Sequence, residues 1–147
     1  MTNETSLQRF LDAQESTYPT ALAEIKRGRK QSHWMWFIFP QIQGLGLSST
    51  SRFYALRNAT EAAAYLKQPL LGSRLLEICA ELLRLPGHDA TRIFGHPDDL
   101  KLRSCLTLFA SLPHPQPVFQ LLLDKFFQGT PDSQTLRLLP SSQQPAD

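Results

Sequence analysis

The sequence predicts an all-α protein, folded as a compact multihelical single domain. Apolar residues recur every three or four positions along most of the chain, which is the spacing of a helix with one buried face. A Gly or a Pro-rich turn follows most of these stretches, and no alternation of strands and helices separates them. With 147 residues, 41% of them hydrophobic, the chain can bury one core. We place this domain at residues 1–139 and expect a disordered polar tail at residues 140–147.

Eight segments carry the helical pattern. In chain order they are residues 6–15, 18–28, 58–69, 69–85, 90–95, 97–112, 118–129 and 131–139. Ser6 is the expected N-cap of the first helix, and Pro19 occupies the first turn of the second, where proline is tolerated. The clearest helix follows Pro69, because its apolar positions fall on one side of a helical wheel and its charged positions on the other.

Charge and composition exclude several classes of function. The net charge of +2 is too small to indicate nucleic-acid binding, and the polar N-terminus does not resemble a secretory signal. The longest apolar run is far below the ~18 residues that a membrane span needs. The isolated Cys79 and Cys105 are typical of a reduced protein rather than of a disulfide scaffold. We therefore expect a cytoplasmic monomer that binds neither nucleic acid nor a membrane.

The segment "SHWMWFIFPQ", residues 32–41, contains both tryptophans of the chain. Its six consecutive apolar residues, 34–39, leave no polar face in either a helix or a strand, so we expect them to be buried on nearly all sides. His33 and Gln41 attach polar groups to the two ends of this run. One interpretation is a piece of core, and the other is the wall of a pocket for a flat ligand.

A second informative segment is "FGHPDDLKLRS", residues 94–104. On a helical wheel, Asp98 and Lys101 fall within the apolar arc of the helix that begins here. The polar side holds Arg103, Ser104, Thr107 and Ser111. One interpretation is local: Asp98 caps the helix, Asp99 pairs with Arg103, and Lys101 extends along apolar surface. The other is that Asp98 and Lys101 line a cavity beside the aromatic segment.

Other sequence features are less specific. The basic run "KRGRK", residues 26–30, fits a solvated helix end or a contact with phosphates. The four histidines are scattered, without the spacing of metal ligands, and no phosphate-binding glycine motif is present. We expect no metal and no cofactor.

Several stretches of the sequence together resemble a known family. The stretches "GRKQSHWMWFIFPQIQGLG", "AAAYLKQPLLGSRLLE", "IFGHPDDLKLRSCLTLF" and "VFQLLLDKFFQG", in this order, look like the domain-of-unknown-function family 1810. The resemblance spans residues 7–139 and implies a mostly helical fold. It implies no settled activity, cofactor or partner. Members are sometimes labelled calpastatin, but no feature of this sequence supports an inhibitor function.

Two hypotheses of function follow. The first is a pocket, with or without an enzymatic activity, for a small anionic or nucleotide-like metabolite. Its candidate ligand-binding residues are His33, Trp34, Trp36, Gln41, Asp98, Lys101 and Ser104. The candidate catalytic residues are His33, Asp98 and Lys101, since imidazole titrates near neutrality and suits proton transfer. The second hypothesis is a non-catalytic protein-interaction or accessory module. For the first we expect the two segments to meet, with His33 and Gln41 beside Asp98, Lys101 or Ser104.

Overall fold

Helices dominate residues 3–142, the part of the chain that the computed structural model describes. The nine helices of these residues are α1 (Asn3–Lys26), α2 (Met35–Ile38), α3 (Ser49–Phe53), α4 (Ala59–Lys67), α5 (Pro69–Arg84), α6 (Ala90–Phe94), α7 (Asp98–Ala110), α8 (Pro117–Phe127) and α9 (Ser133–Ser142). Extended pairing within this part is limited to one isolated bridge between Ile42 and Leu56. The predicted all-α class is confirmed.

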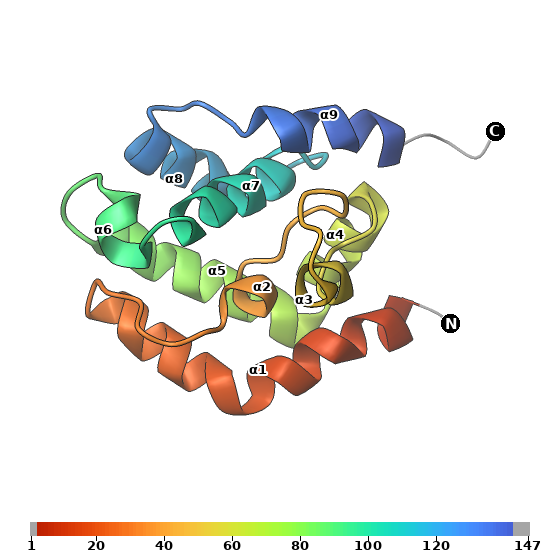
Figure 1. Ribbon diagram of the computed structural model, residues 1–147, viewed down its shortest axis with the longest axis horizontal. Helices are drawn as coiled ribbons and strands as arrows, with labels where there is room; N and C mark the ends of the chain where they lie inside the picture. Colours follow the sequence, from red (N-terminus) through yellow and green to blue (C-terminus); the bar gives the residue numbers. More distant parts are fainter. Residues whose placement is uncertain (1–2, 143–147) are drawn as a thin grey trace.

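Helix α5 lies at the centre of the arrangement. In Figure 1, α1 runs along one edge of the molecule and α7, α8 and α9 along the opposite edge, with α5 between them. Helix α5 packs against α1, α4 and α8, while α7 packs against α8 and α9. The inward face of α5 is fully buried, as its apolar stripe predicts.

The N-terminal helix differs from the expectation. Residues 6–28 were expected to form two helices, but α1 is continuous and contains Pro19 in its interior. Figure 1 shows the helix bending along its length, as helices do where proline removes a hydrogen bond. Both halves bury core residues, Phe10 before the proline and Ile25 after it, so packing outweighs the local cost. Ser6 therefore lies inside the helix and is not its N-cap.

A glycine permits the close approach of α4 to α5. A Cβ atom at Gly72 would lie 2.0 Å from the carbonyl oxygen of Leu66, which is backbone and cannot move aside easily. Only a residue without a side chain fits this crossing.

The aromatic segment is central but less completely buried than expected. Trp34 and Phe39 pack against Phe94 of α6, and both are at most 1% exposed. Trp36 and Phe37 are only half-buried. The reason is that α2 is a single helical turn, so the residues between its inward positions point toward the surface.

Helix α7 is buried on more sides than its sequence suggests. Ser104 and Thr107, assigned to the polar side, are buried, because α9 packs against this face and the backbone N–H of Asp132 donates to the Thr107 hydroxyl. Asp98 does not cap the helix with its side chain. Asp99 does not pair with Arg103; it accepts a hydrogen bond from Thr91 instead.

The C-terminal helix extends past the expected domain end. Helix α9 continues to Ser142, three residues into the segment that was expected to be a tail. Residues 143–147, the rest of that tail, lie outside the described residues.

Candidate functional site

A buried carboxylate shapes the loop that leads into the aromatic segment. Glu24, in the last turns of α1, is 2% exposed. It accepts hydrogen bonds from the backbone N–H groups of Gln31 and Ser32, from the Ser32 hydroxyl, and from the indole N–H of Trp34 at 2.9 Å. Burial alone would raise the pKa of Glu24, but these donors outweigh it and lower the pKa to about 2. Glu24 is therefore ionised at neutral pH and fixes residues 31–34 against α1.

Lys30, in the same loop, reaches the start of α7. Its ammonium lies 2.8 Å from Oδ2 of Asp98, and the Lys101 ammonium lies 2.9 Å from Oδ1 of the same carboxylate. The backbone N–H of Lys30 donates to the carbonyl oxygen of Ile93, which ties the loop to α6. Two lysines thus share one aspartate, and the three side chains together carry one net positive charge.

These charges are largely removed from water. The side chains of Lys30, Asp98 and Lys101 are 7%, 19% and 23% exposed. Burial would raise the pKa of Asp98, but the hydrogen bonds and charges of the two lysines hold it below its ordinary value. Asp98 stays ionised at neutral pH, so it positions the lysines and is not suited to donate a proton.

The cluster lines a cavity of about 380 Å³ beside the aromatic segment. This volume lies within the range of small-molecule sites. The cavity is lined by Lys30, His33, Trp34, Met35, Trp36, Phe37, Ser48, Thr50, Asp98 and Lys101. His33 is exposed at its surface, and the Lys101 ammonium lies 4.2 Å from the centre of the Trp36 ring. The two sequence segments therefore meet, with His33, Asp98 and Lys101 around one space.

The remaining predicted residues border a neighbouring cavity. Gln41 and Ser104 line a space of about 220 Å³ that also contacts Trp36 and Lys101. Because the two cavities share these last two side chains, they adjoin each other. Trp34 belongs to the core more than to either cavity, since it is 1% exposed and its N–H is taken by Glu24.

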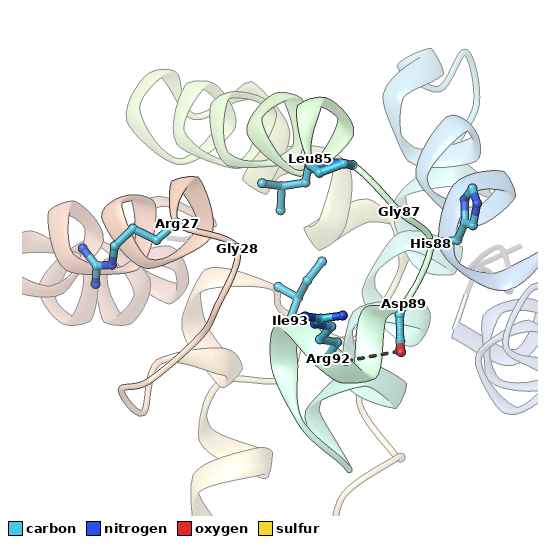
Figure 2. Close-up of a pocket in the computed structure, with 9 residues that line it drawn as sticks. Arg27, Gly28, Leu85, Gly87, His88, Asp89, Arg92 and Ile93 are labelled. Atoms are coloured by element: carbon cyan, nitrogen blue, oxygen red, sulfur yellow. Dashed lines mark hydrogen bonds between the residues drawn. The ribbon is translucent and has the colours of Figure 1, made fainter.

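A larger cavity of about 460 Å³ lies at a different place, where the ends of α1 and α5 meet α6. Figure 2 shows Arg27 extending away from the other labelled residues, and Asp89 bonded to the backbone N–H of Arg92 as the cap of α6. Arg27, His88, Asp89 and Arg92 are all exposed. No buried charge cluster comparable to that of Lys30 and Asp98 lines this space, so we regard it as the weaker candidate.

Sequence reasoning missed the two charged residues, Lys30 and Glu24, that shape the site. Lys30 was noted only as part of a basic run, and periodicity could not show which of its four cations turns inward. Glu24 was not noted, although a signal exists: an acidic residue near a helix C-terminus opposes the helix dipole and needs another partner.

Among the side chains that the structure describes, no group of three or more His, Cys, Asp or Glu residues is arranged to hold a metal ion. None of the helices described is both long and apolar enough to cross a bilayer.

Comparison with known proteins identifies the family of the chain. Residues 4–139 match the family described as "Protein of unknown function (DUF1810)". The chain belongs to this family. The crystal structure of the conserved hypothetical protein Rv1873 from Mycobacterium tuberculosis is similar, with 44% sequence identity and a TM-score of 0.88. The similarity covers 90% of this chain and 95% of that one. A search of curated proteins found no match.

Proposed function

We propose that this protein binds a small anionic metabolite with a flat, nucleotide-like part in the cavity beside Trp36. The observation that carries the proposal is the pair of lysines, Lys30 and Lys101, that share Asp98 on the cavity wall. Two cations that are largely removed from water share one anion, which leaves one uncompensated positive charge. A bound anion gains most from such a charge where the dielectric constant is low.

Free hydrogen-bond donors support the proposal. An ammonium group has three N–H donors. Among the described residues, Lys30 uses two of them, on Asp98 and on the carbonyl of Ser32, and Lys101 uses one, on Asp98. Three donors therefore remain on two lysines that line the same cavity, which is the arrangement that a phosphate or carboxylate requires.

Trp36 and His33 supply the rest of the binding surface. Trp36 is half-buried and borders the cavity, so part of its ring is available to pack against a flat group. His33 is exposed on the same wall and is the residue best placed to exchange a proton with a bound molecule. Asp98 orients the two lysines. Trp34 holds the loop in place rather than contacting the ligand.

Isothermal titration with adenosine 5′-monophosphate (AMP), adenosine and inorganic phosphate tests the proposal. We expect AMP to bind more tightly than either of its parts, and its affinity to fall as salt is added. Lys30→Met and Lys101→Met should each weaken AMP binding by roughly tenfold or more, since a charge-assisted hydrogen bond is lost. Lys67→Met, which removes an exposed cation from the end of α4, is the matched control and should bind like the wild type. Absence of binding, or equal effects of all three variants, would contradict the proposal.

One observation favours the alternative of a protein-interaction module. Leu47, just before α3, is 81% exposed, and Phe53, in α3, is 57% exposed. Both values are high for large apolar side chains. Failure of all three probes to bind would favour this alternative.

A further inference from the structure

Gln41, which lines the second cavity, carries a buried polar group without a partner. The amide nitrogen Nε2 of Gln41 is fully buried and has no hydrogen bond among the described residues, and the residue as a whole is 7% exposed. Its backbone is fixed, because its carbonyl oxygen accepts a hydrogen bond of 2.9 Å from the N–H of Leu56. Buried polar groups in proteins are almost always paired, and an unpaired one costs stability. Because Gln41 lines the cavity, its unpaired donor is suited to receive an acceptor atom from outside the protein.

The position of this donor relates it to the lysine cluster. Gln41 lines the cavity of about 220 Å³ that shares Trp36 and Lys101 with the first cavity. Trp36 therefore borders both spaces. A ligand with its anionic group at the lysines can extend past this ring toward Gln41.

The other walls of the second cavity indicate a neutral group. Leu45, Pro97 and Leu100 provide apolar surface, and the carboxylate of Asp132 would repel a second negative charge. Ser104 is 6% exposed, and its hydroxyl donates to the carbonyl of Leu100, which leaves its oxygen able to accept from a ligand N–H. An amide donor and a hydroxyl acceptor together match a ring carbonyl and an adjacent ring N–H.

We infer that the ligand is a nucleoside monophosphate with an oxo-substituted base, whose ring carbonyl accepts from Nε2 of Gln41. This inference rests on the proposed function, because the phosphate occupies the cavity of Lys30 and Lys101. Gln41 is then the residue that determines base specificity. The Ser104 hydroxyl accepts a hydrogen bond from the ring N–H. Trp36, which borders both cavities, packs against the ligand between its phosphate and the substituted edge of its base.

Isothermal titration with inosine 5′-monophosphate (IMP) and AMP tests the inference, since the two differ only in the oxo or amino substituent at one ring position and in the adjacent N–H. We expect the wild type to bind IMP roughly tenfold more tightly than AMP, because the wrong base leaves the buried donor unpaired. Gln41→Met keeps the length of the side chain and removes the donor, so the preference for IMP over AMP should disappear. Gln43→Met, an exposed neighbour in the same loop, should keep the preference and serves as the control.

The outcomes separate this inference from the proposed function. Equal wild-type affinities for IMP and AMP overturn the inference and leave the proposed function standing, and this comparison needs no variant to fold. A preference that survives in Gln41→Met also overturns the inference, because it shows that the Gln41 amide does not determine the choice of base. If neither nucleotide binds, the proposed function fails and the inference fails with it.

Discussion

Replacing Glu24 with Gln tests the internal support of the site. The carboxylate of Glu24 accepts from three residues of the following loop, and its pKa lies at about 2 instead of its ordinary 4.5. At about 1.4 kcal/mol per pKa unit, this difference corresponds to about 3 kcal/mol of stability. Glutamine has nearly the same shape and can keep its oxygen toward the N–H donors, so Glu24→Gln removes mainly the charge.

The stabilisation by Glu24 depends on pH in a predictable direction. Because the pKa is lower in the folded state than in the unfolded state, the stabilisation is fully present above about pH 4.5 and is lost as the pH falls toward 2. Glu24→Gln should therefore lower the free energy of unfolding by about 3 kcal/mol at pH 7, and by less than half of that at pH 3. In a thermal melt at pH 7 this corresponds to a decrease in Tm of roughly 6–12 °C.

Urea denaturation at the two pH values measures both free energies. Glu15→Gln, an exposed substitution on the same helix with the same change in charge, is the control and should have little effect. A loss of unfolding free energy below 0.5 kcal/mol, or an equal loss at pH 7 and pH 3, would refute the conclusion that Glu24 is ionised and stabilises the following loop.

Two further predictions concern packing. Trp34→Ala should destabilise the fold by about 3–5 kcal/mol in urea, because Trp34 is 1% exposed, whereas Trp36→Ala should cost much less, since Trp36 is half-buried. Equal losses in these two variants would show that the burial of the segment is misassigned. Gly72→Ala should lower Tm markedly, since its Cβ would lie 2.0 Å from the Leu66 carbonyl oxygen. A Gly72→Ala protein that melts like the wild type would contradict the close packing of α4 on α5.

The helical class and most helix positions could be predicted because they depend on local spacing. Periodic apolar residues located α5, α7 and α8 to within a few positions. The errors arose where distant contacts decide the outcome. Helix α1 continues through Pro19 because both halves bury residues in the core, and this benefit cannot be seen in local sequence. Ser104 is buried because α9, about thirty residues later, covers it.

The candidate site was predictable in outline for a physical reason. Asp98 and Lys101 fall on an apolar arc, and buried charges need partners, so a nearby partner could be expected. The identity of that partner could not, because Lys30 belongs to a loop without periodicity. The unpaired amide of Gln41 was equally invisible in sequence, since only coordinates show which polar groups remain unsatisfied.

The most direct test of the proposed site is a crystal structure of the protein grown with AMP. The account predicts the phosphate within hydrogen-bond distance of the ammonium groups of Lys30 and Lys101, with the base against Trp36. The account would be contradicted if the nucleotide bound instead in the cavity between Arg27 and Arg92. It would also be contradicted if no nucleotide were bound at millimolar AMP, a concentration at which even a weak site is occupied.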